Sequence, residues 1–187
     1  MSVFTSKREK RLWAWTLAVV LAIYSTLGLA NTLADTFFNH EAIGAGLFLL
    51  CCFLVLGTVL SQGWKRRPSD SELVVALGVI AAYVLVFVRM SIPTERSHLI
   101  EYGVVAIFIY EALLERIAAG KKVVFPAIVA IVLTSLIGGI DECIQGFLPN
   151  RVFDPVDMLF NVLAAVMAIG ASSALRWARR RRPRPSP

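Results

Sequence analysis

The chain has 187 residues, of which 57% are apolar, and it carries 19 Lys and Arg against 13 Asp and Glu, for a formal net charge of +6. A mean hydropathy of +0.70, with the apolar residues in long uninterrupted runs, excludes an ordinary soluble domain and favours a protein of the lipid bilayer. The cations stand in short hydrophilic stretches between or beyond these runs, as membrane topology requires, so we expect no nucleic-acid partner.

The apolar runs predict an all-α, polytopic membrane helix bundle. A helix needs roughly 20 apolar residues to cross a hydrocarbon core of about 30 Å. In chain order, the six predicted spans are residues 12–34, 42–61, 72–90, 98–116, 123–143 and 155–175. Pro126 lies near the predicted start of the fifth helix, where proline is tolerated, and Asp154 with Pro155 reads as a helix cap followed by the first helical residue.

The distribution of Lys and Arg predicts the orientation of these spans, because cations near helix ends are retained on the cytoplasmic side. The four basic segments are the amino terminus, the second loop, the fourth loop and the tail, at 7–11, 65–67, 116–122 and 176–182. They alternate as six helices with both termini in the cytoplasm require. We therefore expect one integral membrane domain over residues 1–176 and a disordered, Pro- and Arg-rich cytoplasmic tail over 177–187.

Packing inside the bundle is predicted from two further features. Ala164, Ala168 and Ser172 stand four residues apart on one face of the sixth span, where small residues let helices approach closely in lipid. Glu111 and Glu115 lie one turn apart in the inner half of the fourth span. Glu111 is expected to pair across the bundle or to face a water-filled cleft, and the helices carry too little further charge to predict an ion path.

Polar residues gather at what this topology makes the outer face of the membrane. The predicted site draws on three spans and one loop, and its members are His98, Glu101, Tyr102, Asp141, Glu142, Gln145, Arg151, Asp157 and Asn161. Helical spacing puts Asp141 and Gln145 one turn apart and points Glu142 elsewhere. Because all these residues reach the same level of the membrane, we expect them to converge.

The four carboxylates of this group need compensation, since each costs about 2.5–3.5 kcal/mol at helix-centre depth and less toward the interface. Arg151 supplies one positive charge. A divalent cation bound by carboxylate oxygens and His98 would supply more, although the spacing selects no particular metal. Alternatively, the carboxylates orient Arg151 and His98 toward the phosphate of an anionic lipid head group.

Each of these residues also has a simpler explanation when it is taken alone. Asp157 and Glu101 fit the first turn of a helix, where a negative charge complements the helix dipole. Tyr102 fits an aromatic belt, and Asp141 and Glu142 fit a helix end that faces water. The combination of the residues, rather than any one of them, favours a shared functional site.

The order of these residues resembles the VanZ-like family, in which a His precedes Glu and Tyr, followed by Asp-Glu, Gln, a Pro-Gly-Arg turn, and Asp and Asn opening the last helix. The matching residues are His98, Glu101, Tyr102, Asp141, Glu142, Gln145, Phe147, Pro149, Arg151, Asp157 and Asn161. The resemblance covers about residues 98–170. Asn150 replaces the usual Gly of the turn, and Asn also tolerates a left-handed backbone conformation, so we expect the turn to be kept. Ala164 stands where a Gly often follows the Asn, and a small Ala permits similar packing.

The resemblance implies a multi-pass protein of the bacterial cytoplasmic membrane, in a group named for lowered sensitivity to teicoplanin, a glycopeptide antibiotic with a lipid tail. We expect an outward-facing site that binds an envelope lipid or amphiphile, with Arg151 at an anionic head group. One alternative is a metal-assisted hydrolase or transferase acting on a lipid-linked envelope precursor, with a carboxylate or His98 as general base. Another is a structural subunit of a membrane complex. Binding is favoured because no nucleophile with an oriented base is evident.

Overall fold

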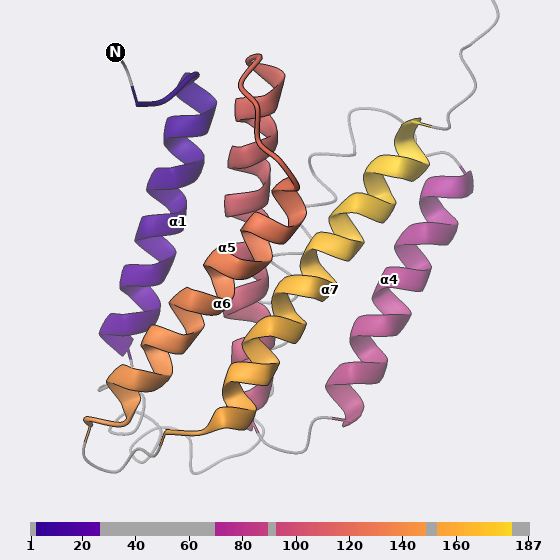
Figure 1. Cartoon of the computed structure of the whole chain (residues 1–187). Helices are drawn as coiled ribbons and strands as arrows, with labels where there is room; N and C mark the ends of the chain where they lie inside the picture. The colour runs from indigo at the N-terminus through magenta and orange to yellow at the C-terminus, as the bar shows by residue number, and fades with distance from the viewer. Residues whose placement is uncertain (1–2, 27–69, 90–92, 149–152, 181–187) are drawn as a thin grey trace, which may run out of the picture.

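The computed structural model describes residues 3–26, 70–89, 93–148 and 153–180, and these ranges are all-α. Their helices, drawn in Figure 1, are α1 (Lys7–Thr26), α4 (Asp70–Arg89), α5 (Pro93–Ala118), α6 (Pro126–Gln145) and α7 (Pro155–Arg180). Each of them contains most of one predicted span. The span predicted at 42–61, and the end of the one predicted at 12–34, lie outside the described residues, so six spans remain a prediction.

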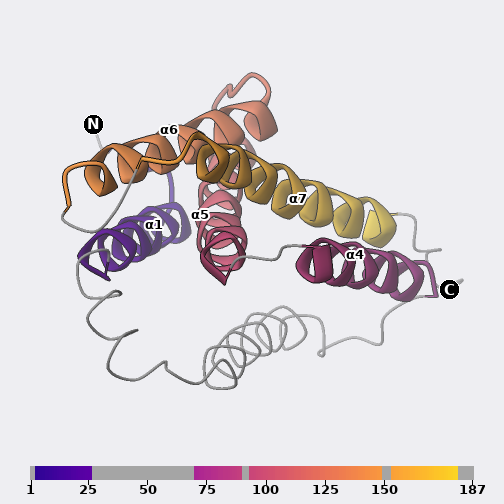
Figure 2. The ribbon, with the colours of Figure 1, turned by 90° about the horizontal axis from the view of Figure 1, so that it is seen from below.

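α5 is the central helix of the described bundle. It packs against α1, α6 and α7, while α7 also packs against α6 and α4. Figure 2, a view along the bundle, shows α5 between α1 and α4, with α6 and α7 lying across one side of this row. Because α5 touches three neighbours, residues around much of its circumference are buried, and side chains from the other helices meet on it.

Local signals in the sequence set the helix ends. α6 begins with Pro126 in its first turn, as predicted. The Asp154 carboxylate accepts a hydrogen bond of 2.8 Å from the Val156 N–H, which confirms the predicted cap of α7. At the end of α5, Gly120 adopts a positive φ of 83° and its N–H and that of Lys121 bond back to the carbonyls of Ile117 and Arg116. These two hydrogen bonds end the helix, and they require the left-handed conformation that glycine adopts without strain.

α7 extends further than predicted. Helix continues through Trp177 to Arg180, so the first part of the tail expected at 177–187 is helical. The reason is that the helix-blocking prolines begin only at Pro183, while Ala178 is a strong helix former and is buried.

α6 has the burial pattern of a membrane helix rather than of a soluble one. Its exposed face is an apolar stripe at four-residue spacing, formed by Ile128, Val132, Leu136 and Ile140. Its buried face carries small and polar residues instead, namely Ala130, Thr134, Gly138, Asp141, Glu142 and Gln145. A helix in water buries its apolar face, whereas a helix in lipid can expose that face and turn its polar side chains inward.

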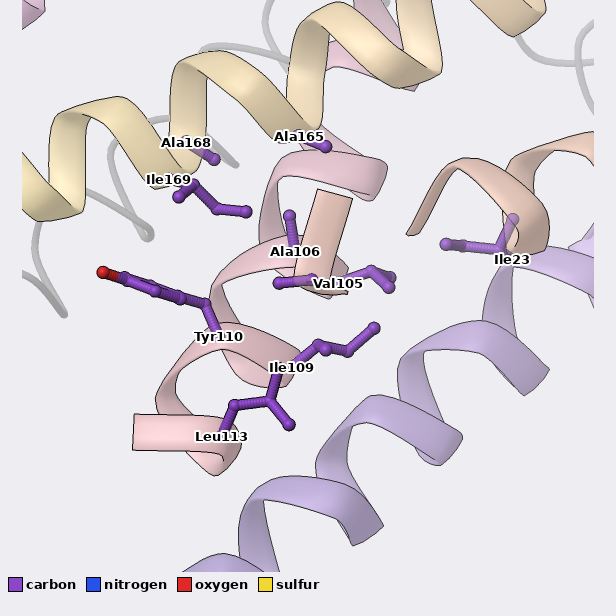
Figure 3. Close-up of a cluster of buried hydrophobic side chains, with 10 residues drawn as sticks. Ile23, Val105, Ala106, Ile109, Tyr110, Leu113, Ala165, Ala168 and Ile169 are labelled. Atoms are coloured by element: carbon purple, nitrogen blue, oxygen red, sulfur yellow. The ribbon is translucent and has the colours of Figure 1, made fainter. Parts of the chain in front are cut away.

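Both α6 and α7 are long and apolar enough to cross a membrane. The buried face of α7 is built from small residues, as predicted: Ala164 and Ala168 are buried, and a Cβ placed on Gly103 of α5 would lie 3.7 Å from the Cβ of Ala168. Close backbone approach between α5 and α7 therefore replaces large apolar side chains at this contact. Further along the same helices, a core of mainly aliphatic side chains fills the space between α1, α5 and α7, including Ile23, Val105, Ile109 and Ile169 (Figure 3).

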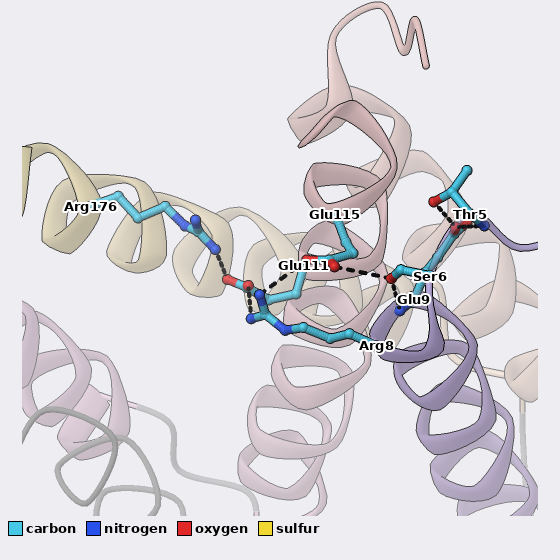
Figure 4. A network of polar contacts seen from close by, with 7 residues as sticks. All are labelled: Thr5, Ser6, Arg8, Glu9, Glu111, Glu115 and Arg176. Atoms are coloured by element: carbon cyan, nitrogen blue, oxygen red, sulfur yellow. Dashed lines mark hydrogen bonds and ion pairs between the residues drawn. The ribbon is translucent and has the colours of Figure 1, made fainter. Parts of the chain in front are cut away.

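An ion network ties three helices together near the amino-terminal end of α1. Glu111 of α5 lies between Arg176 of α7 and Arg8 of α1, and Arg8 also pairs with Glu115 at 3.1 Å (Figure 4). The prediction that Glu111 pairs across the bundle is thus confirmed. These charges compensate one another where the helices leave the predicted spans.

Glu9 is the buried carboxylate of this region and lies outside the predicted span that begins at residue 12. It accepts a hydrogen bond of 2.6 Å from the Thr5 N–H and another from the Thr5 hydroxyl, and it lies 3.0 Å from the Arg116 guanidinium. Burial alone would raise the pKa of Glu9, but the bonds from Thr5 and the charge of Arg116 outweigh it and lower that pKa.

We predict that Glu9→Gln lowers the thermal midpoint of the purified protein at pH 7 by several degrees, a loss of about 1–3 kcal/mol. A lowered pKa in the folded state gives stability above the unfolded pKa that is lost as pH falls through the folded pKa. The gap between wild type and variant should therefore close in acid. Midpoints measured from pH 7 down to pH 3 test this, and a gap that stays constant over that range would contradict it.

Candidate functional site

Three helix ends meet at the end of the bundle opposite the ion network. They are the first half of α5, the end of α6 and the start of α7, which lie together at the lower end of the bundle in Figure 1. These segments carry eight of the nine residues predicted for the site. The ninth, Arg151, lies outside the described residues.

His98 joins α5 to α7. Its Nδ1 lies 2.9 Å from the Oδ1 of Asn161, and its Nε2 lies 3.8 Å from the Oδ2 of Asp157. Because an amide oxygen only accepts hydrogen bonds, the contact with Asn161 requires the proton on Nδ1. His98 is buried, and its ring also stacks on that of Tyr102, with centroids 5.7 Å apart.

Tyr102 joins α5 to α6. It is 0% exposed, and its hydroxyl donates a 2.7 Å hydrogen bond to the Oδ2 of Asp141. The interpretation of Tyr102 as an aromatic-belt residue at the membrane surface is therefore wrong. It stands one turn after His98 on the face of α5 that α6 covers, so its polar tip reaches a carboxylate rather than the head-group region.

The end of α6 contributes two buried carboxylates. Gln145 donates to the Oδ2 of Asp141 at 3.3 Å and to the Oε1 of Glu142 at 3.4 Å, and the backbone N–H of Asp154 donates to the Oε2 of Glu142 at 3.3 Å. The expectations that Glu142 points away from Asp141 and Gln145, and that the two carboxylates face water, are wrong. α6 packs against both α5 and α7, so the buried face at its end is wide enough to take in both carboxylates.

Gly138 is a site residue that the sequence analysis missed. A Cβ added there would lie 2.6 Å from the Nδ2 of Asn161 and 2.9 Å from its Cβ, closer than packed atoms come. Gly138 thereby lets Asn161 reach His98. Helical spacing shows only that Gly138, three and four residues before the two carboxylates, shares their face of α6. Its contact with Asn161 depends on how α7 packs on α6.

Seven predicted residues, each buried or half-buried, thus lie in contact with one another. We call this group the polar cluster. They are His98, Tyr102, Asp141, Glu142, Gln145, Asp157 and Asn161. Glu101 is half-buried on α5, next to Tyr102. Within the polar cluster, His98, Asp141 and Glu142 each offer a ligand atom, and these atoms all lie within 4.8 Å of one another. This trio has the chemistry of a divalent metal site.

An open hollow lies away from the polar cluster, beyond the end of α5. Its volume is about 360 Å³, and it is lined by Val3, Thr5, Arg116, Lys121, Lys122 and Val123. Its basic lining is explained by the predicted cytoplasmic location of these loops. It contributes no residue to the candidate site.

The VanZ/LLP1 family model matches residues 45–176. The match covers more than half of the chain, which therefore belongs to this family, as the resemblance implied. Family membership and two helices able to cross a bilayer together indicate a membrane protein. No curated protein and no solved structure matches the chain.

We predict that Gly138→Ala destabilises the protein by about 1–3 kcal/mol, because the new methyl group must displace Asn161. Gly139→Ala is the matched control: its Cβ would meet only the Cε of Met158, at 3.5 Å, so it should leave stability unchanged or raise it by up to about 1 kcal/mol through the helix propensity of alanine. Unfolding of both variants in mixed micelles measures the difference. Equal effects of the two substitutions would contradict the packing of Asn161 on Gly138.

Proposed function

We propose that this member of the VanZ/LLP1 family binds the head group of an envelope lipid or a related amphiphile at the polar cluster. In this account the protein sits in the bacterial cytoplasmic membrane with six spans, both termini in the cytoplasm and the polar cluster at the outer face. The observation that carries the proposal is the convergence of titratable side chains from α5, α6 and α7 in one buried place. Buried polar groups in membrane bundles are costly and are typical of functional sites.

Exposed aromatic side chains beside the polar cluster support an amphiphilic ligand. Phe147, just after α6, is 90% exposed, and Phe153, just before α7, is also exposed. The Cβ of Phe153 lies close to Gly146, and both phenylalanines are within two residues of a member or partner of the polar cluster, namely Gln145 and the backbone N–H of Asp154. Apolar rings next to a cluster of polar side chains suit a ligand with a hydrocarbon tail and a polar head.

In this proposal, Arg151 binds the anionic part of the head group. It belongs to the segment that connects α6 and α7 and lies outside the described residues. A guanidinium pairs with phosphate or carboxylate oxygens through two parallel hydrogen bonds. The buried carboxylates and His98 would then orient the ligand and exclude other head groups. Binding of a lipid-tailed glycopeptide or its membrane target at this site is the route by which the protein would affect teicoplanin sensitivity.

A metal-assisted hydrolase or transferase acting on a lipid-linked envelope precursor is the second candidate. It is favoured by one observation, namely that His98 lies beside carboxylates that can accept a proton, with Tyr102 holding Asp141 in place. A structural subunit of a membrane complex is the third. Product formation from extracted envelope lipids, lost in Asp141→Asn, would replace the binding proposal with the enzyme.

We predict that Arg151→Ala weakens binding of dodecyl phosphate by about 10–100-fold, the loss of one charge-assisted contact. Neutral dodecanol should bind equally to variant and wild type. Arg89→Ala, which removes an exposed cation at the end of α4, is the matched control and should bind dodecyl phosphate as wild type does.

Titration calorimetry in neutral detergent micelles gives the affinity of each protein for each ligand. If wild type binds dodecyl phosphate no better than dodecanol, the proposed head-group site fails. If Arg89→Ala weakens binding as much as Arg151→Ala, general surface charge rather than the site accounts for the affinity.

A further inference from the structure

We infer that His98, Asp141 and Glu142 bind one divalent transition-metal ion of the Zn²⁺ or Mn²⁺ kind. The inference rests on the proposed function in one respect: the ion would give the acidic polar cluster a positive centre for the phosphate oxygens of a head group. The binding of the ion itself needs no lipid. The two claims can therefore be tested separately.

The first step toward an ion site is the proximity of its ligand atoms. The three ligand atoms come from α5 and α6, lie within 4.8 Å of one another and belong to residues that are all buried. A tetrahedral Zn²⁺ ion bound at about 2.0–2.2 Å sets its ligand atoms roughly 3.3–3.6 Å apart. Small side-chain rotations toward a common centre are enough to reach this geometry.

The second step is the orientation of His98. Its Nδ1–H donates to the Oδ1 of Asn161, and in the neutral ring Nε2 then carries the lone pair. Histidines that bind metals are held in the same way, with the other ring nitrogen donating to an oxygen of a neighbouring residue. Gly138 makes room for the Asn161 side chain that supplies this oxygen.

The third step is charge. Nε2 of His98 lies 3.8 Å from the Oδ2 of Asp157, so a third carboxylate stands close to the two proposed carboxylate ligands. Glu142 is 0% exposed, and the hydrogen bonds it accepts from Gln145 and Asp154 come from neutral donors at 3.3–3.4 Å. A divalent ion bound by Asp141 and Glu142 would neutralise the charges of both carboxylates. A second proton on His98 would offset only one charge.

The fourth step is the choice of ion. One imidazole nitrogen with two carboxylates is a mixed ligand set. The imidazole nitrogen favours Zn²⁺, and the two carboxylates also suit Mn²⁺, whereas Mg²⁺ and Ca²⁺ prefer sites made of oxygen ligands alone. We therefore expect Zn²⁺ or Mn²⁺ to compete successfully against an excess of Mg²⁺.

The test uses the full chain in lipid-free detergent micelles, loaded with Zn²⁺ or Mn²⁺ in the presence of Mg²⁺, desalted and measured by elemental analysis. About one ion per chain is expected for wild type, with at least tenfold weaker binding in Glu142→Gln, a nearly isosteric change. Asn161→Ala should weaken binding about 10–100-fold, because Asn161 positions His98 without touching the ion. Glu111→Gln, at the opposite end of the bundle, is the matched control and should retain the ion.

Co²⁺ provides a readout that depends on no variant. Substituted into the wild-type protein, it should give the visible absorption bands of a four-coordinate site, and Zn²⁺ should abolish them. Failure of wild type to retain either ion, or equal retention by Glu142→Gln and wild type, would overturn the inference.

Dodecyl phosphate titrations with and without a chelator separate this inference from the proposed function. Ion binding without any phosphate binding leaves the metal site standing and removes the head-group proposal. Phosphate binding that a chelator leaves unchanged, together with no retained ion, overturns the metal site and leaves the head-group proposal standing.

Discussion

A polar side chain buried between membrane helices must find its hydrogen-bond partners inside the bundle, because lipid offers no donors or acceptors. This constraint explains how α5, α6 and α7 pack around the polar cluster. α6 exposes aliphatic side chains and buries Asp141 and Glu142, and each of these carboxylates finds its partners on α5, on α6 itself or at the start of α7. The position of α7 is fixed in turn, since Asn161 must reach His98 across the gap that Gly138 leaves.

The same constraint separates the two ends of the bundle by charge. At one end, arginines from α1 and α7 form ion pairs with Glu111 and Glu115, and these pairs hold the helices together. At the other end, carboxylates gather around one histidine. An acidic group enclosed in this way is costly unless a further positive partner joins it. That difference is why we assign ligand binding to one end and a structural role to the other.

Much of the described fold could be predicted from the sequence, because membrane helices are marked by long apolar runs and by punctuation such as Pro126 and Asp154. The level of the site could also be predicted, because the charged residues stand near the ends of their spans. Three details of the site could not be predicted from the sequence. Whether Glu142 and Tyr102 face lipid, water or protein depends on which helices cover them, and the role of Gly138 depends on a contact with a helix more than twenty positions away. Periodicity within one helix does not contain that information.

The convergence of α5 and α6 at the polar cluster is tested most directly by a double-mutant cycle between Tyr102→Phe and Asp141→Asn. Unfolding free energies of wild type, both single variants and the double variant in mixed micelles give the coupling between the two side chains. The 2.7 Å hydrogen bond predicts a coupling of about 0.5–3 kcal/mol. Additive effects, with no coupling beyond about 0.3 kcal/mol, would show that the two side chains do not meet and would remove the site.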